Sequence, residues 1–194
     1  GTPDAGIERW RAARMQVTGD APSRINPERQ VYVDYYQWQL ACFRSAFDTA
    51  TSALERRIAA YGAASPWVRA WLAAQDAVFQ ACDGTSVELP ALASNAPGWL
   101  RKDRAYQQAA LDFYSGRYPQ AADRFATIAR DRHSPWRRYG LYLAARSLYR
   151  DALQNPDKVH YDRVSVAVNA VLSSKDDLFG KDDARGIRRA IDFR

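Results

Sequence analysis

Apolar residues recur at spacings of three and four along most of the chain, within segments that are rich in strong helix formers. The alternation of apolar and polar residues that is typical of strands is almost absent. This pattern predicts an all-α fold. The expected helices cover residues 5–17, 31–45, 48–61, 66–82, 99–115, 119–131, 135–154, 159–173 and 182–193.

An internal repeat underlies the helical pattern. Ser65-Pro66-Trp67 recurs as Ser134-Pro135-Trp136, and Leu72-Ala73-Ala74 behind the first copy recurs as Leu143-Ala144-Ala145 behind the second. The repeating unit of about 70 residues contains four helices, which is two helical hairpins of about 35 residues each. Such an array of hairpins predicts an α-solenoid.

Residues 105–131 resemble a tetratricopeptide repeat. Tyr106 stands at the first aromatic position, Ala110 at the small position, and Ala121 and Phe125 mark the second helix. The resemblance implies one right-handed solenoid domain over residues 1–194, with about eight or nine helices in antiparallel hairpins. Its expected parts are an N-terminal extension (1–30), degenerate hairpins (31–82), two tetratricopeptide-like hairpins (99–131 and 135–173) and a C-terminal capping helix (182–194).

The resemblance also implies a binding surface for a protein or peptide partner, because the first helix of each tetratricopeptide hairpin lines a concave groove. The residues that this places in the groove are Gln107, Leu111, Tyr114, Arg138, Tyr142, Arg146 and Tyr149. Arg146 would anchor an acidic side chain or a C-terminal carboxylate of the partner. The tyrosines would supply contact area at a low cost in conformational entropy.

The chain has two cysteines, Cys42 and Cys82. Alone, this isolated pair fits either one disulfide in an oxidising compartment or two inert thiols in the cytosol. In a tetratricopeptide-like stack the helices that carry them are parallel neighbours, so the resemblance implies a Cys42–Cys82 disulfide. We therefore expect a periplasmic or otherwise exported protein, and a cytoplasmic one if both thiols are free.

The sequence carries no recognisable set of catalytic residues. It contains no nucleophile elbow, zinc-protease motif, phosphate-binding glycine loop or calcium-binding loop, and it has only two histidines and four glutamates. No Cys/His cluster has the spacing of a zinc site. We expect a non-enzymatic protein without a metal or cofactor.

The net charge of +6 belongs to the C-terminal half, since residues 101–194 carry nineteen Lys and Arg against twelve Asp and Glu. Arginines at 137, 138, 146 and 150 alternate with tyrosines, a pattern that suits nucleic acid as well as acidic proteins. No segment is apolar enough for a membrane span. The leading hypothesis is a scaffold for a protein or peptide partner in the bacterial cell envelope. The alternatives are an accessory module of a larger cell-wall-acting or secretion complex, and nucleic-acid binding.

Overall fold

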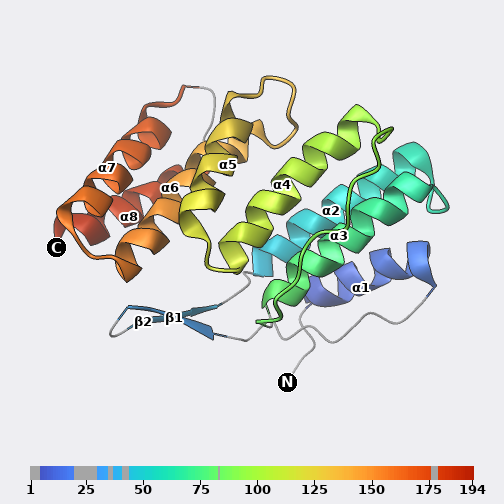
Figure 1. Cartoon of the computed structure of the whole chain (residues 1–194), viewed down its shortest axis with the longest axis horizontal. Coiled ribbons are helices and arrows are strands. Elements are labelled where there is room, and N and C mark those ends of the chain that lie inside the picture. Colours follow the sequence, from blue (N-terminus) through green and yellow to red (C-terminus); the bar gives the residue numbers. More distant parts are fainter. Residues whose placement is uncertain (1–4, 20–29, 35–36, 41–43, 83, 176–178) are drawn as a thin grey trace. The chain divides into compact units, whose positions relative to one another are not determined.

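The computed structural model describes residues 5–19, 30–34, 37–40, 44–82, 84–175 and 179–194. These residues are mainly helical, in agreement with the expected all-α class (Figure 1). The helices are α1 (Ala5–Thr18), α2 (Arg44–Tyr61), α3 (Pro66–Cys82), α4 (Gly98–Tyr114), α5 (Tyr118–Arg130), α6 (Arg137–Gln154), α7 (Lys158–Ser173) and α8 (Lys181–Asp192). Two short strands, β1 (Gln30–Asp34) and β2 (Gln37–Leu40), pair in a two-stranded sheet.

The predicted helix over residues 31–45 is wrong. The structure has β1 and β2 over most of this range, and the next helix begins at Arg44, four residues earlier than expected. The local sequence explains the difference. Residues 31–33 are Val-Tyr-Val, which favour strands, and residues 37–40 alternate polar and apolar side chains as Gln-Trp-Gln-Leu. The degenerate hairpins expected over residues 31–82 therefore lack their first helix.

The chain divides into two compact units. Unit 1 contains Gly1–Val31 and Gln39–Arg104, and unit 2 contains Tyr32–Trp38 and Ala105–Arg194. The division falls within α4, so the first turns of this helix belong to unit 1 and the remainder belongs to unit 2. Most of the residues that the sequence analysis selected for function lie in unit 2.

The core of unit 1 is built from aromatic rings of α1, α2 and α3. Trp10 contacts Phe79 edge to face at 5.2 Å between ring centroids, and Phe47 stacks on Phe79 at 4.4 Å. All three rings are at most 1% exposed. At the edge of this core, the Arg14 guanidinium forms two close contacts with the Asp76 carboxylate, of 2.8 and 3.0 Å. Ring packing and this forked ion pair hold α1 against α3.

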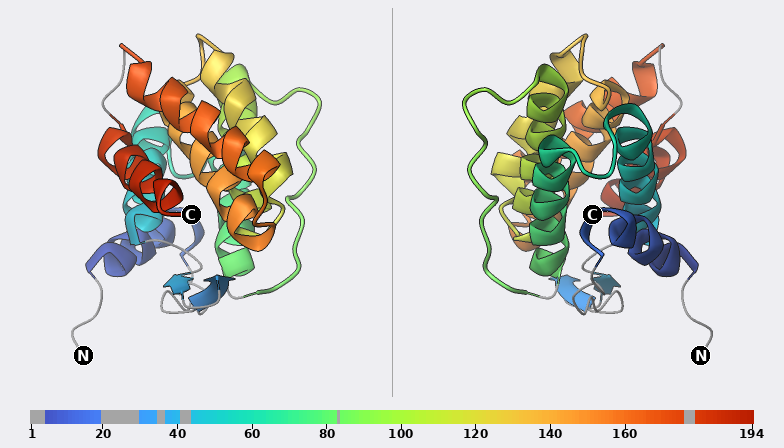
Figure 2. Two further views of the ribbon diagram at one scale, coloured as in Figure 1. Left: turned by 90° about the vertical axis from the view of Figure 1, so that its left-hand side faces the viewer. Right: turned by 90° about the vertical axis from the view of Figure 1, so that its right-hand side faces the viewer.

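Unit 2 is a series of packed helices, in which α6 contacts α5, α7 and α8. Figure 2 shows α7 and α8 beside each other in this unit, and their contacting surfaces bury Val164, Val168, Ala184 and Ile187. α5 and α6 approach closely at Gly140, where a side chain would meet the backbone of α5. Small residues at such positions allow two helices to pack at short distance.

Within the part of the chain that the structure describes, no helix is both long and apolar enough to cross a membrane.

Candidate partner-binding site

The residues that the sequence analysis assigned to partner binding lie on two helices of unit 2. Gln107, Leu111 and Tyr114 are on α4, and Arg138, Tyr142, Arg146 and Tyr149 are on α6. Ring contacts connect the two helices, since Tyr106 of α4 stacks on Trp136 just before α6 at 4.1 Å between centroids. The structure thus brings the two predicted groups of residues onto neighbouring helices.

Three of these side chains are buried. Leu111 is 1% exposed, Gln107 2% and Tyr142 8%. A side chain at this depth cannot contact a partner unless the helices separate, so the structure places these three in the helical core. The spacing of residues along a helix identifies its faces, but it does not reveal which neighbouring element covers each face.

The other four predicted residues are accessible. Arg138 is exposed, and Tyr114, Arg146 and Tyr149 are half-buried. Half-buried tyrosine and arginine side chains are common anchors in protein interfaces, because they are held in place by their neighbours and still present contact area. These four residues form the accessible part of the candidate site.

Two arginines of α6 lie over one aromatic ring of α4. The Cζ atom of Arg146 is 5.3 Å from the centroid of the Phe113 ring, and that of Arg150 is 5.4 Å away. Arg150 is 2% exposed, so it lies beneath the surface. The two residues are one helical turn apart, and each guanidinium is attracted to the negative face of the ring. Arg146 and Arg150 thus form a pair of α6 arginines over the Phe113 ring.

The sequence analysis named Arg150 only as one of several arginines on a basic helix, and it assigned no binding role to Phe113. The structure brings both to the site. The separation of four residues between Arg146 and Arg150 was the signal for their adjacency. Nothing in the sequence pattern identified the ring that they share, because Phe113 and Arg146 come from different helices.

Burial and charge determine the electrostatics of this cluster. Burial lowers the pKa of the Arg146 guanidinium, and the positive charge of Arg150 lowers it further, whereas Tyr142, Tyr114 and Asp183 act in the opposite direction. Burial also raises the pKa of the Tyr114 phenol, against the effect of the two arginines. Arginine stays protonated in proteins, so the charges persist. A carboxylate beside Arg146 would offset both the desolvation and the repulsion.

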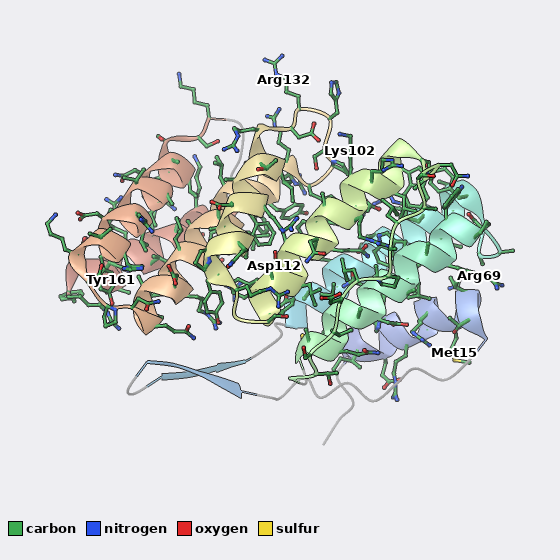
Figure 3. The ribbon with its side chains drawn as sticks, viewed as in Figure 1. Met15, Arg69, Lys102, Asp112, Arg132 and Tyr161 are labelled. Atoms are coloured by element: carbon green, nitrogen blue, oxygen red, sulfur yellow. The ribbon has the colours of Figure 1, made fainter. Side chains whose placement is uncertain are left out.

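A buried carboxylate fixes the helix end that carries Phe113. Asp112 is 4% exposed and accepts hydrogen bonds from Arg117 at 2.8 Å, Arg124 at 2.7 Å and Gln108 at 3.1 Å. Figure 3 marks Asp112 near the C-terminal end of α4. These contacts join α4 to α5 and restrict the position of the neighbouring Phe113 ring.

Four arginines lie in or beside the loop between α5 and α6. Arg130 ends α5, Arg132 lies in the loop, and Arg137 and Arg138 open α6. Arg137 is half-buried and the other three are exposed, and Figure 3 shows Arg132 projecting from the loop. Positive charges in the first turn of a helix oppose its dipole, so they do not stabilise α6 locally. We name these four residues the basic loop.

The aromatic rings next to the basic loop are packed within the unit. Tyr139 contacts Trp136 at 5.8 Å and Phe179 at 4.4 Å between ring centroids, and Tyr142 is buried. Binding of single-stranded nucleic acid relies on aromatic faces that are open for stacking. Of the tyrosines between the α6 arginines, Tyr139 and Tyr142 are thus packed against other rings or buried, whereas Tyr149 is half-buried.

His160 has a capping role in α7. Its Nδ1 atom lies 2.7 Å from Asp157 Oδ1, and its backbone N–H donates to the same oxygen at 2.9 Å. These hydrogen bonds lower the pKa of the Asp157 carboxyl, which caps the N-terminus of the helix. Across the ranges that the structure describes, no group of three or more His, Cys, Asp or Glu side chains could hold a metal ion.

Of the two cysteines, Cys82 lies within the described residues. Cys82 is fully buried at the C-terminal end of α3, where its Sγ atom lies 3.9 Å from the Val78 carbonyl oxygen. Cys42 lies outside the described residues. The Cys42–Cys82 disulfide therefore stays a prediction.

No protein-family model, curated protein or solved structure matches this chain. The tetratricopeptide resemblance therefore rests on the sequence pattern of residues 105–131.

Proposed function

We propose that this protein is a non-enzymatic helical-repeat scaffold that binds a protein or peptide partner through α4 and α6. The observation that carries the proposal is the pair of α6 arginines over Phe113, flanked by the half-buried Tyr114 and Tyr149. Arginine and tyrosine are enriched among residues that dominate binding energy at interfaces. The combination suits a partner that carries a negative group.

The packing of unit 2 supports a tetratricopeptide-like arrangement. α6 contacts the helix before it and the helix after it, and α8 contacts both α6 and α7. This is the pattern expected when antiparallel hairpins stack in sequence and a final helix covers the last one. In the proposed arrangement α4 with α5, and α6 with α7, are two consecutive hairpins, and α8 is the capping helix.

Arg146 is the proposed anchor. Its forked guanidinium can form two parallel hydrogen bonds to one carboxylate, which is either an acidic side chain or the C-terminus of the partner. Tyr114 and Tyr149 supply contact area beside it. Arg150 stays beneath the surface and adds to the positive field at Arg146 without touching the partner.

The proposed location is the bacterial cell envelope, where the expected Cys42–Cys82 disulfide would persist. The proposal also leaves room for a role as an accessory module of a larger cell-wall-acting or secretion complex. In both cases the binding face is the same, so the two settings differ in the identity of the partner and not in the chemistry of recognition.

Affinity capture from a lysate of the native host tests the proposal, with wild type and the Arg146→Ala/Tyr149→Ala variant in parallel. We expect the wild type to capture one protein in stoichiometric amount. Nuclease treatment should not remove this protein, and the variant should not capture it. Arg163→Ala, on the exposed surface of α7, is the matched control and should keep the partner. Circular dichroism must show full helicity in all three proteins. If nuclease treatment removed the captured proteins, the result would favour nucleic-acid binding and contradict the proposal.

A further inference from the structure

We propose that unit 1 binds the surface of an anionic lipid bilayer through the end of α2 and the starts of α3 and α4. This inference goes beyond the proposed function, because it concerns where the scaffold is held and not which partner it binds. The surface consists of residues 56–69 and 98–102, all of which belong to unit 1, and we name it the unit 1 tip. It combines an uncharged apolar turn, aromatic side chains and a local excess of cations.

The turn between α2 and α3 presents apolar side chains to solvent. Residues 58–68 contain no charged residue, although Asp, Glu, Lys and Arg make up 26% of the chain. The exposed residues of the turn, apart from glycine, are Ala59, Ala60, Tyr61, Ala64 and Pro66. An uncharged surface of this kind is suited to contact the boundary between lipid headgroups and acyl chains.

Hydrogen bonds of the turn itself fix its shape. Gly62 has a φ of +90°, in the left-handed region that favours glycine, and its N–H donates to the Ile58 carbonyl oxygen at 2.8 Å. The Ser65 N–H donates to the Gly62 carbonyl oxygen at 3.2 Å, and Ser65 Oγ accepts from the Val68 N–H at 3.4 Å. These contacts end α2 and start α3 through the backbone and one serine, which leaves the outward side chains of the turn available for contact.

Aromatic rings stand beside the turn. Tyr61 is 46% exposed and stacks on Trp99 at the start of α4, with 4.6 Å between the ring centroids. Trp67 and Trp99 are half-buried. Tyrosine and tryptophan combine an apolar body with a polar end, and they are enriched where proteins meet the membrane–water interface. Met15 of α1, which is 50% exposed, lies at the same end of unit 1 as Arg69 in Figure 3 and adds a further apolar side chain.

The unit 1 tip is positively charged. Residues 56–75 and 89–102 contain no Asp or Glu, whereas an average stretch of this chain of the same length would contain about four. The same residues include Arg56, Arg57, Arg69, Arg101 and Lys102. An excess of cations beside exposed apolar and aromatic side chains is typical of proteins that bind anionic membrane surfaces.

Two of these arginines are unrestrained. Arg57 is held by Asp103, and Arg101 donates to backbone carbonyl oxygens in the segment before α4. Arg56 and Arg69 are exposed, and within the part of the chain that the structure describes their guanidinium groups form no hydrogen bond or ion pair. Arg69 lies in the first turn of α3, where a positive charge opposes the helix dipole. Neither guanidinium is occupied within unit 1, so both can follow the mobile phosphate groups of lipids.

A lipid surface suits this arrangement better than a folded partner does. The side chains that dominate protein interfaces are large, held in place and inserted into pockets. The unit 1 tip instead presents small alanine side chains and two unrestrained arginines. Attraction between such cations and a layer of anionic headgroups needs no matched geometry. Single-stranded nucleic acid also carries phosphates, but it relies on open rings for stacking, and one face of Tyr61 already stacks on Trp99.

Co-sedimentation of the full chain with lipid vesicles tests the inference. One preparation contains phosphatidylcholine alone, and the other contains equal parts of phosphatidylcholine and the anionic lipid phosphatidylglycerol. At low ionic strength, we expect the protein to bind the anionic vesicles at least about tenfold more tightly than the neutral ones, and to dissociate as salt is added. Equal binding to both preparations, or binding to neither, would overturn the inference.

Substitutions of Ala64 locate the contact. This exposed alanine lies in the uncharged turn. Ala64→Glu should lower the affinity for anionic vesicles about fivefold, and Ala64→Lys should raise it by about the same factor, because the two side chains carry opposite charges to the membrane surface. Both variants should keep the helicity of the wild type in circular dichroism, since the position is at the surface. Equal effects of the two substitutions would contradict a contact at the turn.

Removal of the two unrestrained arginines is the second test. Arg56→Ala/Arg69→Ala should lower the affinity for anionic vesicles at least about tenfold. Arg132→Ala/Arg163→Ala removes the same charge from exposed positions of unit 2, so this matched control should change the affinity less than about twofold. Equal losses in the two double variants would contradict binding through the unit 1 tip. If Arg56→Ala/Arg69→Ala abolished binding of a single-stranded oligonucleotide and left vesicle binding unchanged, the tip would belong to nucleic acid and the inference would be wrong.

Discussion

Gly140 of α6 lies against the carbonyl oxygen of Phe125 in α5, so closely that a Cβ atom on the glycine would be 2.6 Å from it. The same Cβ would be 2.7 Å from the Ala129 backbone nitrogen. Backbone atoms cannot move aside as the end of a flexible side chain can. The α5–α6 contact therefore depends on the absence of a side chain at this position.

Gly140→Ala should destabilise the protein by about 1–3 kcal/mol, because the added methyl group forces α5 and α6 apart. Urea unfolding followed by circular dichroism measures the change. Gly186→Ala in α8 is the matched control, since its nearest neighbour would be the Arg189 side chain at 3.8 Å. The control should be neutral or slightly stabilising, as alanine favours a helix over glycine. Equal effects of both substitutions would contradict the close approach at Gly140.

The buried ion pair of unit 1 gives a second prediction. Asp103 is fully buried, and both of its oxygens accept hydrogen bonds from Arg57, at 2.8 and 2.9 Å. Asp103→Ala leaves the Arg57 charge in a largely buried site, so we expect a loss of about 3–5 kcal/mol in the free energy of unfolding. Glu55→Ala breaks an exposed pair with Arg9 and should cost less than about 1 kcal/mol. A loss of the same small size for Asp103→Ala would show that the pair is not buried in solution.

Alkaline pH should unfold the chain through three tyrosines that the fold shields from water: Tyr142 is buried, and Tyr106 and Tyr114 are half-buried. Burial raises the pKa of Tyr106, Tyr114 and Tyr142 above the ordinary value of 10.0. In the unfolded state these phenols ionise from about pH 10, whereas in the folded state they stay neutral. The stability that they contribute is therefore complete below pH 10 and falls as the pH rises above it.

Absorbance of tyrosinate and far-ultraviolet circular dichroism, recorded over the same pH series, check this prediction. We expect part of the tyrosinate signal to appear only together with the loss of helix. If all tyrosines ionised near pH 10 in a fully helical protein, the burial of these three rings would be contradicted.

The expected disulfide is tested by peptide mapping under non-reducing conditions, which should yield a fragment that joins Cys42 to Cys82. Such a bond closes a loop of about 40 residues and should contribute on the order of 3–4 kcal/mol. Reduction should therefore lower the midpoint of urea unfolding. Recovery of two separate thiol-containing peptides from protein prepared without reductant would contradict the pairing and remove the argument for an exported protein.

Helix positions could be predicted from the sequence because apolar spacing and breakers act locally. Apart from the 31–45 prediction and the start of α2, the expected helix ends agree with the structure to within two residues, and α3 has the predicted bounds. The error at residues 31–45 has a physical origin. Gln37-Trp38-Gln39-Leu40 has the period of two that is typical of a strand, but the segment is short. The helix-forming residues that follow it therefore dominate the prediction for this range.

The site was predictable only in part. The sequence placed Arg146 and Tyr149 on one helix, and the structure leaves both accessible. It could not show that Leu111 is covered, because coverage depends on which elements meet in three dimensions. For the same reason it missed the Phe113 ring that Arg146 and Arg150 share.

The central claim is that the partner binds the face of α6 that carries Arg146. Site-specific photo-crosslinking in the native host tests this claim most directly. A benzophenone amino acid replaces Tyr149 in one protein and Val166, which is 71% exposed on α7, in the other. The account predicts a discrete crosslinked product from position 149, with the same protein that affinity capture identifies, and none from position 166. A product from position 166 alone, or crosslinks of equal yield from both positions, would contradict it.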